Sequence, residues 1–374
     1  MTLSLIISLL MLIYIIRSIL ILVGMAKERS KALPRNNNNN LPFVTVIVPA
    51  RNEEATIIEC LRAISANSYP KDKYEIIAID DRSNDNTGEL IKSLLNEIPN
   101  LKMKVLREDR TEENLKGKPG AIQSCIDEAR GEILLFTDAD CQPSSNWIET
   151  MVRGFQDKNI GLVSSFTNVS GNRFFDHLQS LEWLYLNSIG SAAVGWNKPM
   201  SCFGNNLAVR KSDFLAVGGY EKIKFSVTED LALLHAIHDS GKSVRYLPHP
   251  DSLVFTKSND TIKDYLRQHH RWVVGAKDIG TLSFLFVLTS IAMWLSLSLS
   301  VIFLIPFLAI SIFVVRFALD YLIINSALNY TKSKIHKSWL IPAVFFFMIM
   351  ELVAPFLLLK KNIIWKEQTF QKNN

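Results

Sequence analysis

The chain has 374 residues, 48% of them hydrophobic, and a formal net charge of +5 at pH 7. It can bury a large core, but its apolar residues are concentrated in a few long segments. The positive charge is explained by the flanks of those segments, which excludes a nucleic-acid-binding surface as its source, so we expect no nucleic-acid partner. The sequence also predicts no protein partner. The cysteines have no metal-binding spacing and are expected to be reduced packing residues: Cys60, Cys125, Cys141 and Cys202.

Three apolar segments predict membrane-spanning helices. Residues 3–24 are long enough for one crossing, and residues 281–327 are long enough for two. Residues 338–359 are a further candidate. We interpret residues 1–25 as an anchor rather than a cleaved signal peptide, because the apolar run is too long and neither a basic region nor a cleavage site accompanies it.

The basic flanks predict how the chain is oriented in the membrane. Four basic residues lie within 27–35 and none precedes the first segment, which places the N-terminus outside and the middle of the chain in the cytoplasm. Three lysines within 332–337 place that loop inside as well. Lys360, Lys361 and Lys366 would then lie outside, so 338–359 either crosses against this rule or is a re-entrant or interfacial element. We expect an integral protein of the cell (inner) membrane.

A polar linker, residues 26–41, is expected after the anchor because it is basic and contains five consecutive asparagines. Short apolar runs then alternate with segments of helical spacing. The expected strands are 43–48, 74–79, 102–106 and 133–136, and the expected helices between them are 55–64, 86–94 and 121–129. This alternation predicts an α/β fold with a doubly wound sheet.

The run that ends at Phe136 leads directly into two acids, Asp138 and Asp140. An apolar run of this kind is typical of a buried parallel strand, and ligands bind at the carboxyl ends of such strands. Two carboxylates one residue apart, with no basic neighbour in sequence, favour a divalent cation and hence a diphosphate. The sequence therefore predicts a Mg²⁺ or Mn²⁺ site here.

Other strand ends carry polar residues that could share the same pocket. Asp80 or Asp81 could accept hydrogen bonds from a ribose or a base, although an Asx-turn or a helix cap explains them equally well. Lys118, between glycines and a proline, could reach a phosphate or base, and a solvated lysine is the equal alternative.

The second part of the chain predicts further strands and an aromatic helix. The helices are expected over 147–155 and 174–189, and the strands over 160–165, 207–210, 243–247 and 252–256. The helix over 174–189 is rich in aromatic residues, and we favour a place in the core over one in an acceptor-binding wall.

Two motifs have both a structural and a catalytic interpretation. Thr228–Asp230 precedes a helix over 231–238 and is either a cap or the source of a general base, Asp230. On a helix over 261–276, Arg271 could bind pyrophosphate and Trp272 could stack on a sugar, unless the helix is simply anchored at the membrane interface. His269 and His270 lack a metal partner set and are interpreted as surface or packing residues.

Taken together, these residues resemble family 2 glycosyltransferases, in particular the membrane-bound branch with cellulose, hyaluronan and chitin synthases and ceramide glucosyltransferases. The resemblance covers roughly 42–275 and the flanking spans, because four acidic stations and Gln-x-x-Arg-Trp occur in the family's order. It implies a GT-A type mixed sheet with helices on both faces and membrane helices at both ends. The implied domains are a cytoplasmic catalytic domain over 42–260, an interfacial helix over 261–280, a membrane region over 281–360 and a polar tail over 361–374.

The resemblance also implies a role for each motif residue. The nucleoside and nucleotide would contact Pro49, Ala50, Arg51, Glu53, Asp80, Asp81, Lys118 and Asp138. Asp138 and Asp140 would hold Mg²⁺ or Mn²⁺, and Asp230 would be the catalytic base. The acceptor and pyrophosphate would contact Phe203, Gly204, Asn205, Glu229, Gln268, Arg271 and Trp272. One base without a second acid suits a single displacement with inversion at the anomeric carbon.

The expected function is therefore transfer of a sugar from a nucleotide-sugar, most often a UDP-sugar, to a lipid or lipid-linked acceptor in the membrane. A processive polysaccharide synthase is the alternative, disfavoured because the chain has fewer C-terminal spans than those enzymes. A sugar-nucleotide nucleotidyltransferase and a non-catalytic nucleotide-binding adaptor are further alternatives. Arg316, Asp320 and Glu351 lie in apolar segments, where charges are either functional or paired structurally.

Overall fold

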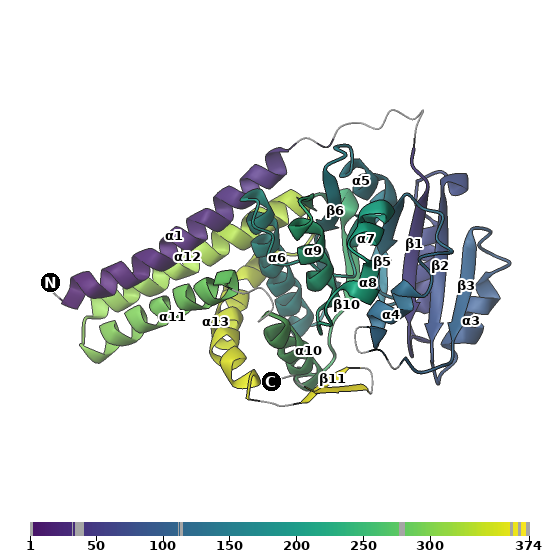
Figure 1. Cartoon of the computed structure of the whole chain (residues 1–374). Coiled ribbons are helices and arrows are strands. Elements are labelled where there is room, and N and C mark those ends of the chain that lie inside the picture. Colours follow the sequence, from purple (N-terminus) through teal and green to yellow (C-terminus); the bar gives the residue numbers. More distant parts are fainter. Residues whose placement is uncertain are drawn as a thin grey trace.

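The computed structural model describes residues 3–31, 33, 41–110, 112, 115–276, 281–359, 362–365 and 368–371. An α/β domain forms one side of the molecule, and long helices extend away from it on the other (Figure 1). The described part contains four helices long and apolar enough to cross a membrane. The predicted combination of an α/β domain and apolar helices at both ends of the chain is confirmed.

The domain is built on a seven-stranded mixed sheet in the order β3-β2-β1-β4-β8-β6-β9. Its strands are β1 (Val44–Ala50), β2 (Tyr74–Asp81), β3 (Leu101–Leu106), β4 (Ile133–Phe136), β6 (Ile160–Ser165), β8 (Leu207–Arg210) and β9 (Ser243–Leu247). The first four are mutually parallel, and β8 runs antiparallel to both of its neighbours. Residues of β1, β2 and β4 are buried almost throughout, as expected for strands covered on both faces.

A second sheet of three short strands, in the order β5-β10-β7, follows the acids. It consists of β5 (Cys141–Pro143), β7 (Thr167–Ser170) and β10 (Val254–Lys257). The sequence analysis missed β5 and β7, because segments of three or four residues with polar and proline positions carry no periodic signal. β5 begins one residue after Asp140, so this sheet fixes the chain just beyond the predicted metal site.

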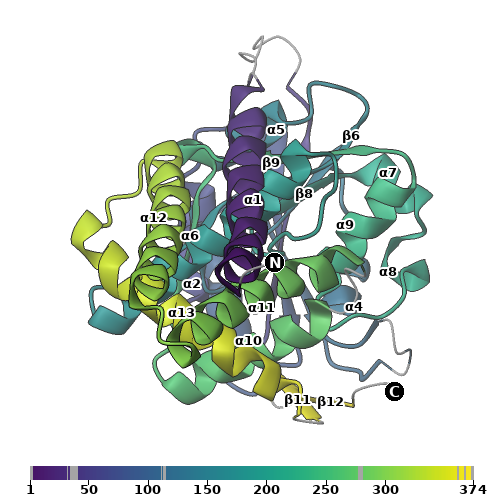
Figure 2. The ribbon, with the colours of Figure 1, turned by 90° about the vertical axis from the view of Figure 1, so that its left-hand side faces the viewer.

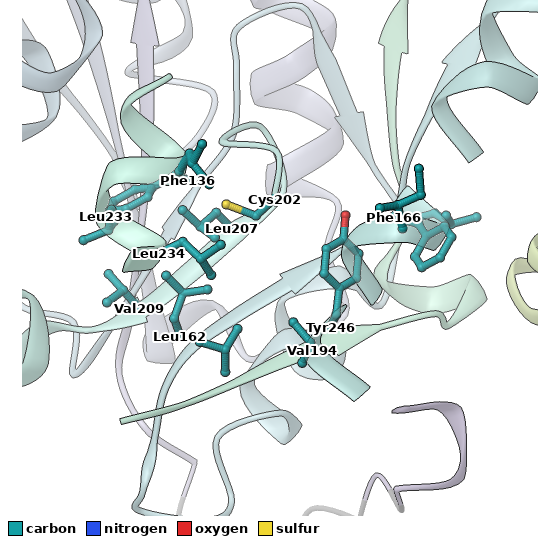
Figure 3. Close-up of a cluster of buried hydrophobic side chains, with 14 of the residues drawn as sticks. Phe136, Leu162, Phe166, Val194, Cys202, Leu207, Val209, Leu233, Leu234 and Tyr246 are labelled. Atoms are coloured by element: carbon teal, nitrogen blue, oxygen red, sulfur yellow. The ribbon is translucent and has the colours of Figure 1, made fainter. Parts of the chain in front are cut away.

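Helices cover both faces of the large sheet. They are α2 (Ile57–Ser65), α3 (Thr87–Leu94), α4 (Lys118–Gln123), α5 (Trp147–Arg153), α7 (Lys211–Ala216), α8 (Gly219–Lys222) and α9 (Glu229–Asp239), with 3₁₀ turns at Lys71–Lys73, Pro250–Ser252 and Lys337–Trp339. The helix predicted over 121–129 instead occupies 118–123, which places Lys118 in its first turn. Figure 3 shows one face of the core, where Leu233 and Leu234 of α9 lie over strand residues Leu207 and Val209.

The aromatic helix α6 (Phe174–Gly195) lies at the centre of the molecule and is longer than predicted. It packs against α1 (Leu3–Ser30), and the two backbones touch where Gly24 meets Gly195. A Cβ on Gly195 would lie 2.0 Å from the Gly24 carbonyl oxygen, so only glycine allows this approach. The predicted core position of α6 is confirmed by the burial of most of its residues.

The first helix continues into the segment predicted as a polar linker. α1 extends to Ser30, where Glu28 is buried and accepts hydrogen bonds from Arg245 Nε at 2.7 Å and from the Tyr246 backbone N–H at 3.1 Å. The linker prediction for 26–30 is therefore wrong, because a long-range ion pair with β9 extends the helix. The asparagine run lies outside the described residues.

The C-terminal part adds four helices and a hairpin: α10 (Ile262–Gly275), α11 (Thr281–Ile302), α12 (Pro306–Thr331), α13 (Leu340–Leu357), β11 (Asn362–Trp365) and β12 (Gln368–Gln371). The hairpin lies within the predicted polar tail, and two helices span 281–327 as predicted. α1, α11 and α12 extend side by side, whereas α13 crosses beneath them toward α10 in both views (Figures 1 and 2). The two interpretations of 338–359 both remain predictions.

Charged residues within these apolar helices are paired with one another. Arg316 lies 3.4 Å from Asp320 and 2.9 Å from Glu351, and it is 1% exposed. Asp320 also accepts a hydrogen bond of 2.6 Å from the Tyr14 hydroxyl. Arg17 donates to Ser290 and to Tyr185 of α6. These contacts join α1, α11, α12, α13 and α6. They support the interpretation that the charges are paired structurally.

Candidate active site

A cavity of about 430 Å³ opens at the carboxyl ends of β1, β2 and β4 and extends to α11. The parallel register pairs Ala50 with Asp80 and Ile47 with Phe136, so the loops after these three strands meet at one edge of the sheet. All but one of the predicted site residues line this cavity: Pro49, Ala50, Arg51, Glu53, Asp81, Lys118, Asp138, Asp140, Phe203, Gly204, Asn205, Glu229, Asp230, Gln268, Arg271 and Trp272.

Lys118 lies between the predicted metal acids and the residue that precedes the predicted base. Its ammonium lies 2.6 Å from Asp138 and 3.2 Å from Glu229, which is 111 positions away in the sequence. Burial alone would lower the pKa of Lys118, but Asp138 and Glu229 outweigh burial and raise it. Lys118 is therefore a fixed cation inside the cavity, and the alternative of a solvated lysine is excluded by its 10% side-chain exposure.

Asp230 begins the first turn of α9 and faces the loop of Phe203–Asn205. Its carboxylate accepts hydrogen bonds from the backbone N–H of Gly204 at 2.7 Å and of Leu231 at 2.8 Å. Burial and the neighbouring Glu229 raise the pKa of Asp230 to about 6, while Lys118 and the two N–H groups act in the opposite direction. Asp230 therefore accepts hydrogen bonds from the first turn of α9 and from the facing loop, while Thr228 is the N-cap residue. It also has the pKa of a group that accepts protons near neutral pH.

Gly204 allows these groups to converge. A Cβ at this position would lie 3.1 Å from both the Asp230 Cβ and the Lys118 ammonium, and 3.3 Å from Glu229. Any larger residue would have to displace one of the three charged side chains. The sequence analysis included this loop only through the resemblance to known enzymes, and nothing in its residues indicates that a backbone N–H would donate to Asp230.

Asp138 and Asp140 face the cavity from the loop between β4 and β5. The Asp140 carboxylate accepts a 3.4 Å hydrogen bond from Thr256 of β10, and the Asp138 carbonyl accepts one from the Cys60 thiol. The four cysteines are free, buried thiols, as predicted for packing residues. Within the described residues, no group of three or more His, Cys, Asp or Glu side chains could hold a metal ion.

Asp80 and Asp81, near the charged end of the cavity, are bound by arginines that the sequence analysis did not identify and that do not line the cavity themselves. Asp81 is bound by Arg110 at 2.9 Å and by Arg82 at 2.9 Å. Asp80 does not line the cavity; it is 1% exposed and forms an ion pair of 2.8 Å with Arg107. Contact between Asp80 and a nucleotide stays a prediction that this geometry does not support. No local signal points to these arginines, because their loop has no regular periodicity.

The opposite end of the cavity is aromatic. The indole of Trp272 meets Trp183 of α6 edge-on at 5.2 Å and Phe203 at 5.6 Å, and Trp183 stacks on Phe203 at 4.6 Å. Gln268 accepts a hydrogen bond of 2.9 Å from Asn259, which orients its amide. α6 is thus part of the hydrophobic core and also lines the cavity, although the sequence analysis treated these two positions as alternatives.

An apolar surface continues from the aromatic residues to the membrane helices. Leu186 and Ile189 of α6 and Phe286 and Val287 of α11 line the same cavity as the acids. The sequence analysis did not include these four residues, because nothing in their local sequence separates them from other apolar helix positions. The cavity therefore has a charged end and an apolar end.

Comparisons with known proteins identify the family and a similar fold. The profile described as "Glycosyl transferase family 2" matches residues 45–214, and that described as "Glycosyl transferase family group 2" matches residues 133–355, more than half of the chain. The computed structure is similar to that of a mannosyltransferase from Pyrobaculum calidifontis in complex with GDP-Man and Mn²⁺. The TM-score is 0.61 at 20% identity, over 93% of this chain and 99% of the other.

Two curated proteins are similar to this chain in sequence. A β-monoglucosyldiacylglycerol synthase of Trichormus variabilis is 29% identical over 68% of this chain, and an N-acetylglucosaminyltransferase of Rhizobium meliloti is 27% identical over 62% of it. The chain spans 53% and 55% of the lengths of these relatives.

Proposed function

Because the chain belongs to glycosyl transferase family 2, and is thus a glycosyltransferase, we propose that it transfers a hexosyl group from a nucleotide-sugar to a hydroxyl of a membrane lipid. We further propose that the catalytic domain lies in the cytoplasm and the N-terminus outside. The observation that carries the proposal is the continuity of one cavity between carboxylates at one end and Phe286 and Val287 of an apolar helix at the other.

The charged end suits the donor. Asp81, Arg51 and Glu53 line the part of the cavity nearest β1 and β2, where the nucleoside would lie. Lys118 would compensate negative charge on the diphosphate, since its ammonium already lies among acids. The Pyrobaculum enzyme binds GDP-Man, so both UDP- and GDP-sugars are candidate donors.

The two aspartates fit a hard divalent cation. Asp138 and Asp140 supply oxygen ligands, and Mg²⁺ or Mn²⁺ is commonly held by one or two carboxylates together with substrate phosphates. The Asp138 side chain is 38% exposed toward the cavity and is available to such a cation once Lys118 turns to the phosphates. A bound cation would supply charge stabilisation for the leaving diphosphate.

Asp230 is the proposed base. As the acceptor hydroxyl attacks the anomeric carbon, its proton would pass to the carboxylate, whose pKa of about 6 leaves it ionised at pH 7. The bond to the diphosphate breaks in the same displacement, so the anomeric configuration inverts. The Gly204 N–H holds the carboxylate in place during the transfer.

The apolar end suits a lipid acceptor. The indole of Trp272 and the rings of Trp183 and Phe203 offer a surface for the head group, and Ile189 and Phe286 offer one for hydrocarbon. Arg271 lines the cavity between the two ends and would contact the pyrophosphate. The relative from Trichormus variabilis, a glucosyldiacylglycerol synthase, supports a lipid acceptor.

The test is a transfer assay with the full chain in lipid nanodiscs. Radiolabelled UDP- and GDP-sugars are added with Mn²⁺, Mg²⁺ or EDTA, and products are separated into organic-extractable lipid and water-soluble polymer. We expect a labelled lipid that requires metal and is absent with Asp230→Asn. A water-soluble polymer would instead indicate a processive synthase, and nucleotide binding without release would indicate an adaptor.

A further inference from the structure

A buried carboxylate connects the helix of Gln268–Trp272 to the central helix. Glu182 of α6 is 6% exposed, and its two oxygens accept hydrogen bonds of 2.7 and 2.8 Å from the hydroxyl of Tyr265 on α10. The same carboxylate lies 3.0 Å from Nε2 of His269, one turn further along α10. His269 is 8% exposed, so the whole group is closed off from solvent.

Both ring nitrogens of His269 are hydrogen-bonded. Nδ1 faces the backbone carbonyl of Tyr265 at 2.9 Å, and Nε2 faces Glu182. A carbonyl oxygen only accepts, so Nδ1 carries a proton and donates it. Pairing with the Glu182 carboxylate outweighs burial and raises the pKa of His269, which favours the imidazolium form. Tyr265 on α10 is the second titratable neighbour, and α13 packs on it through Phe346, which carries no charge.

This ion pair lies directly behind the aromatic end of the cavity. The His269 ring is 4.9 Å from the indole of Trp272, and Glu182 precedes Trp183 in the chain. Glu182, Tyr265 and His269 are not among the residues that line the cavity, whereas Trp183 and Trp272 are. The pair thus holds the two tryptophans against each other from outside the substrate space.

We propose that Glu182 and His269 are positioning residues for acceptor binding, which fix the register of α10 on α6 and thereby orient the Trp272 indole. An apolar contact between the two helices would allow sliding, whereas a carboxylate held by two donor groups, the Tyr265 hydroxyl and His269 Nε2, permits one arrangement only. The inference rests on the proposed function insofar as Trp272 receives the acceptor. The sequence analysis treated His269 as a surface or packing residue, because its partner lies 87 positions away.

The first test separates acceptor from donor kinetics. His269→Gln and Glu182→Gln are compared with wild type in mixed micelles, with dioleoylglycerol as the acceptor probe and UDP-glucose as donor. We expect the KM for the acceptor to rise about tenfold or more while the KM for the donor stays within about twofold. The control is His177→Gln, since His177 also stacks on a tryptophan, Trp339, at 4.6 Å but lies outside the cavity lining. An unchanged acceptor KM, or equal rises in both KM values with a lowered Tm, would overturn the proposal.

The second test needs no activity and therefore separates this inference from the proposed function. A histidine cation quenches the fluorescence of an indole beside it. We expect wild-type emission to contain a quenched component that Trp272→Phe removes and that His269→Gln converts to a bright one. If no donor supports transfer, the proposed function fails and this measurement still decides the positioning role. Trp272 emission that is the same with and without His269 would refute it.

Discussion

The two ends of the cavity are built by different kinds of contact. At the charged end, Asp81, Asp138 and Asp140 lie at or just after the carboxyl ends of parallel strands β2 and β4. At the apolar end, helices distant in sequence meet: Glu182 binds His269 across 87 positions, and in the apolar helices beside it Tyr14 binds Asp320 across 306. The first end is thus a property of the sheet, and the second depends on how α1, α6, α10 and α12 pack.

This difference implies that donor binding and transfer to the acceptor can be impaired separately. Damage to helix packing should impair transfer to the acceptor while nucleotide binding persists. Damage at Asp230, where the two ends meet, should abolish the reaction without affecting either binding end. The predictions below follow this logic, beginning with the largest effect.

Asp230→Asn should reduce kcat by about 10³-fold, because a positioned general base contributes that order of rate enhancement. Nucleotide binding should persist, since the amide keeps the shape of the carboxylate and its contact with Gly204. Release of nucleotide and calorimetric binding measure the two quantities. Asp239→Asn, at the exposed far end of the same helix, is the matched control. A variant that retains a tenth of wild-type kcat would rule out Asp230 as the base.

Asp320→Leu should lower the free energy of unfolding by about 3 kcal/mol, because it leaves the Arg316 guanidinium and the Tyr14 hydroxyl buried with fewer partners. The double variant with Arg316→Met should recover part of this loss. Thermal unfolding in detergent measures both, with the exposed Ser311→Ala on the same helix as control. If the double variant is less stable than Asp320→Leu alone, the pairing interpretation is wrong.

Gly195→Val should cost about 2 kcal/mol, since its side chain would collide with the Gly24 carbonyl and force α1 away from α6. Ala26→Val, at an exposed position of α1, should cost little. Because α6 carries Trp183, we expect the transfer rate of Gly195→Val to fall more than its affinity for nucleotide. Equal losses would contradict the separation of the two ends.

The sequence indicated for a physical reason that the residues of the charged end would lie together. Its strands are fully buried, so they appear as apolar runs that stop at polar residues such as Asp138, and parallel strand ends must share an edge. The arginine partners of Asp80 and Asp81 were missed, because ion pairs between loops leave no periodic trace.

The apolar end of the cavity could not be derived from the sequence in this way. The apolar lining by Ile189 and Phe286, the Glu182–His269 pair and the extension of α1 to Ser30 all depend on contacts between distant segments. The binding roles of Arg271 and Trp272 were preferred only through a resemblance to known enzymes, since their local pattern fits an interfacial helix equally well, and Gln268 entered only with that resemblance. Residues 26–30 were misread for the same reason: Glu28 appears solvated until Arg245 is placed beside it.

The pH dependence of transfer provides the finest test of how the two ends meet. The base must be ionised, so kcat/KM should rise with pH up to the pKa of Asp230, about 6, and then level off. Below that pKa it should fall tenfold per pH unit, because the protonated carboxyl cannot accept the hydroxyl proton.

Substitutions of Glu229 and Lys118, the two charged neighbours of Asp230, should move the midpoint of this pH profile in opposite directions. Glu229 raises the pKa of Asp230, so Glu229→Gln should shift the midpoint to lower pH; Lys118 lowers it, so Lys118→Met should shift the midpoint to higher pH. Each shift should be about one pH unit or less, with the exposed Lys116→Met as the control for Lys118. The midpoint is independent of the plateau rate, so a loss of donor binding in either variant does not obscure it. Shifts in the same direction would mean that the pH profile reports a group other than Asp230. The pKa of one carboxyl that lies between an acid and a cation cannot move in the same direction when either neighbour is removed.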